Sequence, residues 1–165
     1  MAVQITPAGT ITREQTLLPT RRLLVKSGET VTKGNVCELD ATPADGILIS
    51  PTGATVNKQH FVALQSVTGD GTLDCAVAVR GHFVTVVADG AIVPGEYVKV
   101  SAATAGQVQA GGLISTGTAV GVYWGKEGGV YAKGGSGDFL ESLTDTENFS
   151  QVAAADGDIV EIELL

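Results

Sequence analysis

The chain has 165 residues, enough for one domain with a hydrophobic core, and its charged residues are sparse at 17%. No apolar run approaches the roughly 18–20 residues that cross a bilayer, which argues against a membrane protein. The formal net charge of −8 argues against general nucleic-acid binding, because neutralising phosphates requires a basic surface. The first residues lack a charged leader followed by an apolar block, so we expect no signal peptide.

The charges are distributed unevenly along the chain. Half of the Lys and Arg residues lie in its first fifth, at Arg13, Arg21, Arg22, Lys26 and Lys33. After Lys133 no basic residue follows, while eight acidic residues do: Asp138, Glu141, Asp145, Glu147, Asp156, Asp158, Glu161 and Glu163. Either both ends are simply solvated, or a basic arm reaches an acidic surface on a neighbouring subunit.

Residues 1–22 are predicted to form an extended arm. Thr6-Pro7, Gly9 and Leu18-Pro19 disfavour a helix, and the apolar residues are too scattered to build a core. Such a segment is either disordered alone or ordered against a partner.

From Leu23 onward the sequence predicts a series of short strands. Apolar or alternating runs separated by Gly, Pro and Asp are typical of strands and tight turns. In 74–81, for example, Cys75, Val77 and Val79 alternate with smaller or polar residues, the period of a strand with one crowded face. The candidate strands lie at 23–25, 36–39, 47–49, 60–67, 74–81, 83–87, 97–100, 106–112, 118–125, 130–135 and 158–165.

Two segments of this series echo each other. Residues 28–39 (GETVTKGNVCEL) and 90–100 (GAIVPGEYVKV) each contain a Gly, a Val three residues later, a second Gly and then an alternating strand candidate. The echo does not recur at a fixed period, so it indicates two similar strand–turn–strand units rather than a solenoid.

Short strands at roughly 8–12-residue spacing, with almost no helical periodicity, indicate an all-β domain over 23–165, a small barrel or a sandwich of antiparallel strands. One stretch, 136–157, breaks the rhythm, since its apolar residues are loosely spaced as in a helix. We expect an inserted loop there, with room for a short helix.

The sequence offers little chemistry for an enzyme. His60 and His82 each precede Phe at a strand start and have no matching nucleophile motif, so we interpret both as structural. Cys37 and Cys75 lack metal-ligand spacing and are interpreted as buried thiols, although a single bridge between them stays open. We expect no metal site, no cofactor and no catalytic residue.

The neighbouring aromatics Tyr123 and Trp124 have two interpretations. They are either core or edge residues, or anchors of an interface, because Trp and Tyr are enriched in interface hot spots.

From Asp74 to the C-terminus the sequence resembles the small all-β decoration (cement) proteins that cover tailed-phage heads. The resemblance rests on a pattern of Gly and Val at set places in successive strands and turns. The matching positions are Gly81, Val84, Val86, Gly95, Val98, Gly106, Val108, Gly117, Gly121, Gly157, Asp158 and Val160. The piece between Gly135 and Gly157 departs from the pattern.

The resemblance implies a β-tulip-like fold and a homotrimer on the outer capsid surface of a virion, made in the host cytoplasm. Its partner would be the major capsid protein, whose neighbouring subunits it would bridge, stabilising the head. Residues 1–22 are then the capsid-binding arm, and deleting them is expected to abolish decoration without unfolding the domain. The arm's candidate contacts are Ile5, Ile11, Arg13, Leu17, Leu18, Arg21 and Arg22.

Two other classes of function stay open. One is a β-domain of another virion part, such as a tail or head fibre. The other, less favoured, is a small enzyme that uses His60 or His82. A lipoyl-type or biotinyl-type carrier is set aside, because neither Lys99 nor Lys126 lies on a hairpin tip with the flanking motif.

Overall fold

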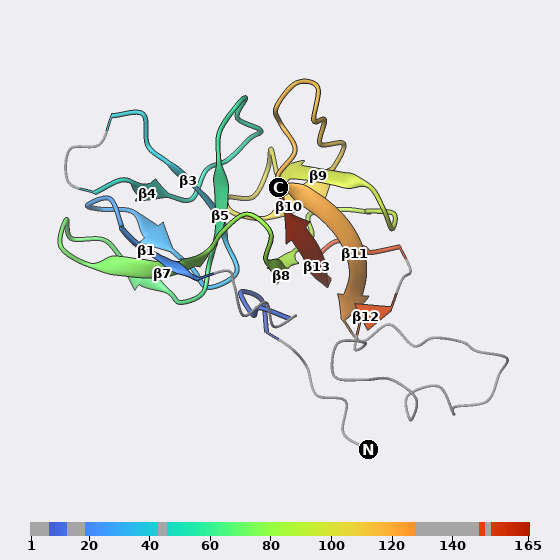
Figure 1. Cartoon of the computed structure of the whole chain (residues 1–165), viewed down its shortest axis with the longest axis horizontal. Helices are drawn as coiled ribbons and strands as arrows, with labels where there is room; N and C mark the ends of the chain where they lie inside the picture. Colours follow the sequence, from blue (N-terminus) through green and yellow to red (C-terminus); the bar gives the residue numbers. More distant parts are fainter. Residues whose placement is uncertain (1–6, 13–18, 43–45, 128–148, 151–152) are drawn as a thin grey trace, which may run out of the picture.

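The computed structural model describes residues 7–12, 19–42, 46–127, 149–150 and 153–165. Over these residues the protein is all-β, with strands and turns and no helix (Figure 1). The strands are β1 Arg21–Leu24, β2 Thr30–Val31, β3 Val36–Leu39, β4 Leu48–Ile49, β5 His60–Ala63, β6 Val67–Thr68, β7 Asp74–Ala78, β8 Phe83–Val87, β9 Tyr97–Val100, β10 Val108–Ala110, β11 Gly121–Glu127, β12 Phe149–Ser150 and β13 Ile159–Leu164.

The strands form two larger antiparallel sheets and one small one. The first sheet has the order β1-β7-β5-β3-β4, and the second has the order β10-β9-β11-β13-β8 with β12 added beside β11. β2 and β6 form a separate pair. Neither large sheet closes into a barrel, because only single bridges, Val25 to Leu48 and Ala88 to Val108, connect their outer strands. The predicted all-β class is therefore confirmed, in its open, sandwich-like form.

The two large sheets are built to the same plan. In Figure 1 the first unit (β1–β7) lies on the left and the second unit (β8–β13) on the right. The ladders of the first unit, β1·β7, β7·β5, β5·β3 and β3·β4, recur in the second as β8·β13, β13·β11, β11·β9 and β9·β10. Each unit also has one parallel bridge between its outer strands. We conclude that the fold is an internal duplication.

The duplication extends to the register of the strands. Val62 lies between Val36 and Ala78 in the first unit, as Val122 lies between Tyr97 and Glu163 in the second. Phe61 and Ala63 lie on one face of the wholly buried strand β5, and the residues at the matching positions of β11 are Gly121 and Tyr123. A large and a small residue have thus exchanged places, which conserves core volume, the property that close packing constrains most.

The echoed segments of the sequence form the same turn in both units. In the first, the Asn35 amide donates to the Thr32 carbonyl at 2.9 Å, and the Asn35 side chain accepts from the Thr32 amide at 2.8 Å. In the second, Glu96 makes both bonds with Val93, at 3.0 and 2.7 Å. Each turn has four residues, and its third residue is a glycine, Gly34 or Gly95. These glycines have the positive φ values, 88° and 85°, that a turn with this backbone shape requires at its third position. The prediction of two similar strand–turn–strand units is confirmed.

The first residues differ from the prediction of a separate arm. Residues 9–12 run antiparallel along the outer edge of β8, where Ile11 bridges Val84. β1 begins at Arg21, so the predicted boundary at residue 22 falls inside a strand of the first sheet. The described parts of 1–22 are therefore elements of the fold. Residues 9–12 supply backbone groups to the outer edge of β8, and β1 supplies them to the edge of β7; among the described strands, neither edge has another partner there. The predicted strand at 130–135 and most of the loop 136–157 lie outside the described residues.

Candidate interaction surfaces

The predicted arm residues are found in three different settings. Ile11 is half-buried against the core of the second unit. Arg21 and Arg22 are exposed on β1. Ile5, Arg13, Leu17 and Leu18 lie outside the described residues. The structure therefore does not bring the described members together into one surface.

The segment 7–12 is held mainly by backbone hydrogen bonds. The amides of Gly9 and Thr12 donate to the carbonyls of Thr85 and Phe83 at 2.6 and 2.9 Å, and the Thr85 amide donates to the Thr10 carbonyl at 2.9 Å. The buried Thr85 hydroxyl donates to the Pro7 carbonyl at 2.8 Å and accepts from the Thr10 amide at 2.9 Å. The edge of β8 is thus already occupied by the chain's own strand.

Gly9 lets this segment approach the first unit as well. A Cβ built on Gly9, whose φ is 73°, would lie 2.5 Å from the Ala63 carbonyl oxygen and 2.6 Å from the Gly34 nitrogen. Both neighbours are backbone atoms, which cannot move away as the end of a side chain can. The segment therefore fills a narrow space where the two units meet.

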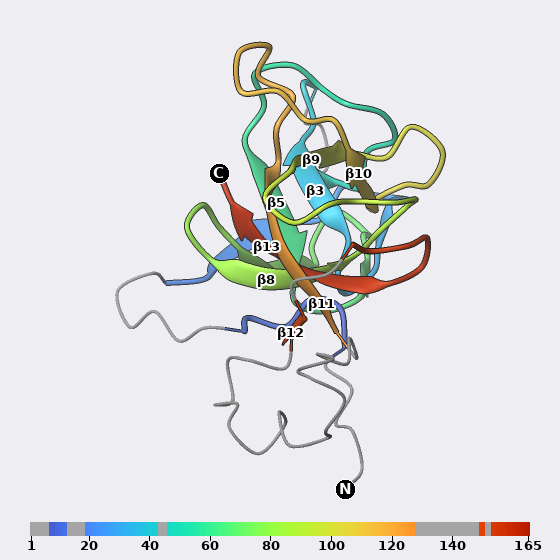
Figure 2. The same ribbon diagram turned by 90° about the vertical axis from the view of Figure 1, so that its right-hand side faces the viewer.

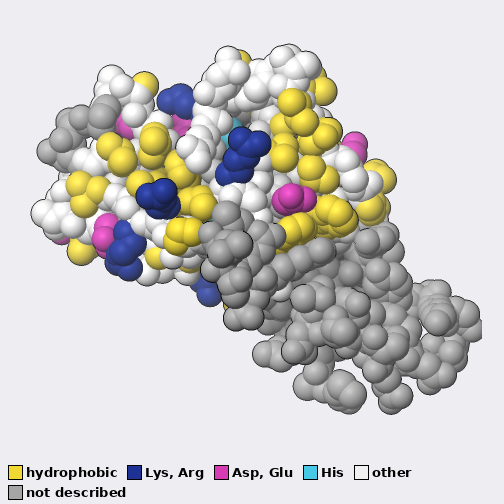
Figure 3. All heavy atoms as spheres, viewed as in Figure 1, with side chains coloured by type: hydrophobic (Ala, Val, Ile, Leu, Met, Phe, Trp, Pro, Cys, Tyr) yellow, Lys and Arg dark blue, Asp and Glu magenta, His cyan; other side chains and the backbone are white. Residues whose placement is uncertain are grey.

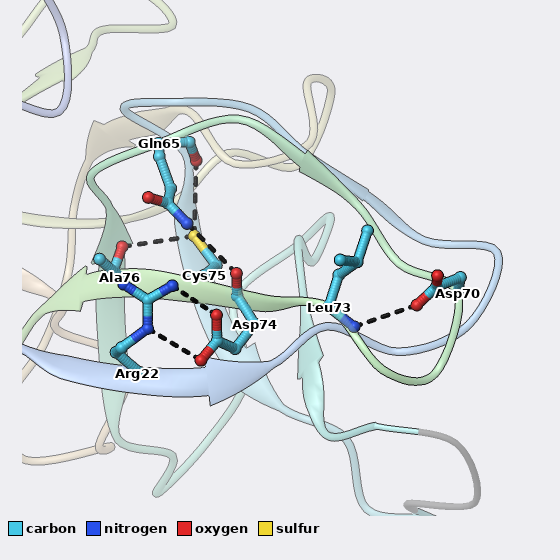
Figure 4. Close-up of polar contacts among 7 residues, drawn as sticks. All are labelled: Arg22, Gln65, Asp70, Leu73, Asp74, Cys75 and Ala76. Atoms are coloured by element: carbon cyan, nitrogen blue, oxygen red, sulfur yellow. Dashed lines mark hydrogen bonds and ion pairs between the residues drawn. The ribbon is translucent and has the colours of Figure 1, made fainter.

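Arg22 is fixed on the surface of the first sheet. Its Nε and Nη2 atoms donate to the two carboxylate oxygens of Asp74 on β7, at 2.8 and 2.5 Å (Figure 4). This two-pronged geometry suits a guanidinium and a carboxylate. The bond to Arg22 lowers the pKa of Asp74, so the carboxylate stays charged at neutral pH. Because both side chains are exposed, the pair orients Arg22 more than it stabilises the fold.

The two predicted aromatic anchors differ in their accessibility. Tyr123 is only 1% exposed and belongs to the core of the second unit, which corrects the interpretation of this residue as a surface anchor. The alternation along β11 is the reason, because Tyr123 pairs with the buried Ile162 and points inward with it. Trp124 points the other way, is 36% exposed and contacts Phe83 with ring centroids 5.7 Å apart.

A shallow hollow lies beside these aromatics. It has a volume of about 260 Å³ and is lined by Pro94, Gly95, Val122, Tyr123 and Trp124. Among the described residues, its walls carry neither a nucleophile with a nearby base nor a group of charges. These residues offer an apolar contact area.

The sequence reasoning missed a second surface, at the tips of two equivalent loops. The loop between β4 and β5 exposes Val56 (58%), and the loop between β10 and β11 exposes Leu113 and Ile114 (53% and 59%). The Asn57 amide donates to the Gly117 carbonyl at 3.0 Å and fastens the loops together at one end of the molecule (Figures 1 and 2). Apolar residues in stretches otherwise rich in Gly, Ser and Thr were the available signal.

A second hollow, of about 250 Å³, lies at the base of these loops. Two cationic residues, Lys58 and Arg80, line it together with Asn57, Ile114, Gly117, Ala119 and Leu165. Figure 3 shows hydrophobic side chains spread over one face of both units, with Lys and Arg residues between them. The loop tips and this hollow together offer apolar contact area beside two cationic side chains.

The structure also assembles a buried polar cluster that the sequence did not suggest. Glu38 on β3 accepts a hydrogen bond from the hydroxyl of Thr55, and His60 on β5 lies with Nε2 3.9 Å from the Glu38 carboxylate. Burial lowers the pKa of His60, against the opposing effect of Glu38. Glu38 and His60 are only 5% and 2% exposed, so the cluster is closed to a substrate in this structure.

This cluster of Glu38, Thr55 and His60, which we call the clasp, joins a loop to a sheet. Thr55 donates directly to the carboxylate, so the imidazole does not lie between hydroxyl and acid as it does in a nucleophilic triad. Thr55 belongs to the β4–β5 loop, while Glu38 and His60 belong to strands. The cluster therefore ties the exposed loop to the sheet, in keeping with the structural interpretation of His60.

The other residues considered as candidates for chemistry, His82, Cys37 and Cys75, are all buried. His82 is buried at a turn, where its Nδ1 lies 3.0 Å from the Val79 amide nitrogen. Cys37 and Cys75 are both buried free thiols, and burial raises the pKa of each. In the described ranges no three His, Cys, Asp or Glu side chains gather as metal ligands would, and no helix is long and apolar enough to span a bilayer.

The sequence matches no protein-family model and no curated protein.

Proposed function

We propose that this chain is a structural virion protein that binds the outside of an icosahedral tailed-phage capsid and bridges neighbouring subunits of the major capsid protein. The proposal includes a homotrimer as the form that decorates the shell. It treats the protein as a binder rather than an enzyme.

One observation carries the proposal. The sequence stretch that resembles phage decoration proteins begins at Asp74 in β7 and includes the second unit, β8–β13. The valines of the pattern, at Val84, Val86, Val98, Val108 and Val160, are all buried core residues of that unit. Its glycines at 81, 95, 106, 117 and 157 occupy turns with positive φ. The residues of the pattern thus have structural roles in the second unit, and this supports the proposal.

The surfaces of the molecule support binding to a protein. The exposed apolar loop tips at Val56, Leu113 and Ile114 are held by the clasp and by the Asn57 bond. Rigid apolar tips lose little conformational entropy when they bind. A molecule that joins several subunits gains avidity from such contacts even when each is weak.

The structure changes the experiment that tests the proposal. Deleting residues 1–22 would remove Arg21 and Arg22 from β1 and expose the edge of β8, so it would mix loss of folding with loss of binding. A substitution at the loop tips avoids this. Ile114 is 59% exposed, and replacing it with Asp changes the surface without opening the core.

Heads of the virus that encodes this chain, prepared without it, are incubated with wild-type protein or with Ile114→Asp and sedimented. We expect the wild-type protein to sediment with the heads and the variant to do so at least tenfold less. Thr116→Asp, an exposed polar position in the same loop, is the matched control for added charge. If wild-type protein stays in the supernatant at all concentrations, the proposed function is wrong. Binding to tails or fibres instead of heads would favour the alternative virion role.

A further inference from the structure

The outer edge of β1 has hydrogen-bonding groups that face away from its sheet. In the described part of the chain, β7 is the only strand that forms a ladder with β1. The Val25 amide donates to the Leu73 carbonyl, so the backbone groups of Val25 face β7. Backbone groups alternate in direction along a strand, and those of Leu24 and Arg22 therefore face the outer edge. There the Leu24 carbonyl accepts from the Ile47 amide at 2.9 Å. Nearer the start of β1, at Thr20 and Arg22, no described residue pairs with this edge.

The internal duplication shows what such an edge accommodates. Arg21 pairs with Val77 in the first unit as Val84 pairs with Ile162 in the second, so Arg22 is equivalent to Thr85 and Thr20 to Phe83. In the second unit these positions bind the extended segment 9–12. The Thr85 amide, the Thr85 carbonyl and the Phe83 carbonyl each form one hydrogen bond to it. The same three groups on the first unit belong to Arg22 and Thr20.

We propose that the outer edge of β1, at Thr20–Arg22, is a docking site for an extended acidic segment of the shell protein, which adds to the first sheet as a further strand. This inference rests on the proposed function and adds to the loop tips a second surface that contacts the shell. The Arg22 amide donates to the docked strand, and the carbonyls of Arg22 and Thr20 accept from it. Addition of a strand to an open sheet edge is a common mode of peptide recognition.

The charge of this edge selects an acidic partner strand. Arg21 and Arg22 are both exposed, and Arg21 makes no ion pair within the described part of the chain. Asp74 already holds Arg22 in a fixed position beside the edge (Figure 4). Opposite charges on neighbouring strands stabilise their pairing, whereas a basic strand would be repelled here. The segment 9–12 on the equivalent edge contains no charged residue, and Arg22 is replaced there by the buried Thr85.

Two substitutions at one position separate the backbone contribution from the side-chain contribution. Arg22→Pro removes the outward amide, and proline is tolerated on an edge strand where its nitrogen faces solvent. Arg22→Gln removes the same charge and the same contact with Asp74 but keeps the amide. Both variants are compared with wild-type protein by sedimentation with heads that lack the chain, after thermal unfolding has shown that they fold.

We expect Arg22→Gln to lower the affinity severalfold through its lost charge, and Arg22→Pro to lower it by at least a further tenfold. Hydrogen exchange gives a second measurement that needs no variant: on wild-type protein the Arg22 amide exchanges freely in solution and becomes protected on heads. Equal binding by the two variants, or an Arg22 amide that stays unprotected on heads, would overturn the proposal.

The same experiment distinguishes the other outcomes. If wild-type protein does not bind heads, the proposed function fails and this inference fails with it. If wild-type protein binds and Arg22→Pro binds equally well, only the β1 edge is excluded. If Arg22→Pro breaks up an oligomer of the protein in solution while binding to heads is unchanged, the strand on this edge comes from a second copy of the chain, and the assigned partner is wrong.

Discussion

Replacing Gly9 with Ala tests whether residues 7–12 are an integral part of the fold. The new Cβ would lie 2.5 and 2.6 Å from backbone atoms of Ala63 and Gly34, too close for either to remain in place. Gly28→Ala is the matched control, because Gly28 also has a positive φ (81°) but nothing within 4 Å of a built Cβ. The difference between the two variants isolates the effect of the close approach.

The structure sets the size of this difference. A positive φ costs an alanine about 1–2 kcal/mol, offset by about 0.4–1 kcal/mol from the stiffer unfolded chain, so Gly28→Ala should lower the free energy of unfolding by about 1 kcal/mol. At Gly9 the clash can be relieved only if the segment leaves the edge of β8. That loses three backbone hydrogen bonds, worth about 0.5–1.5 kcal/mol each, and the packing of Ile11. We therefore expect a loss of about 3–5 kcal/mol.

Urea unfolding measures both values, and hydrogen exchange at Thr85 shows whether the segment has left. The Thr85 amide donates to the Thr10 carbonyl. Its exchange rate should rise in Gly9→Ala and stay at the wild-type value in Gly28→Ala. If both variants lose the same free energy within about 0.5 kcal/mol, the uncertainty of such extrapolations, residues 7–12 do not contribute to the fold as described.

Three further predictions concern the core of the first unit. Phe61→Gly should lower the free energy of unfolding by about 3–5 kcal/mol. Adding Ala63→Tyr should recover part of that loss, because the second unit has Gly and Tyr at the matching positions. A double variant that is no more stable than Phe61→Gly in urea would contradict the equivalence of the units. Burial lowers the pKa of His60 below its ordinary 6.5, so the folded state binds fewer protons than the unfolded state, and stability should fall as the pH drops below about 6.5; a His60→Gln variant with the same slope of unfolding free energy against pH would exclude His60 as the cause. Cys37 and Cys75 should react with a thiol reagent only after unfolding, because burial raises the pKa of each thiol and blocks access; rapid reaction of the folded protein would refute this.

The strands were predictable from the sequence because their pattern is local. The alternation in 74–81 predicted β7, and that in 158–165 predicted β13, since one face of each strand packs on a core. Only the turns of the duplication could be recognised, through their glycines. Its strands conserve register and volume rather than residue type, as the exchange of Phe61 and Ala63 for Gly121 and Tyr123 illustrates.

The long-range contacts could not be predicted in this way. Residues 7–12 carry no periodic pattern, and their position depends on the spare edge of β8 and on the space between Ala63 and Gly34. The joining of Thr55 to Glu38 depends on how the β4–β5 loop folds back on the sheet. For the same reason the sequence suggested that Arg22 belonged to an extended N-terminal arm, whereas Asp74 on β7 holds it against the first sheet.

Imaging of heads by electron cryomicroscopy, with and without the added chain, tests the central claim that this protein works by binding a larger shell. We predict extra density on the outer surface where neighbouring capsid subunits meet, of a size that three copies of the two-unit fold would fill. Heads that look identical with and without the chain, at concentrations well above those of an ordinary protein complex, would contradict the account.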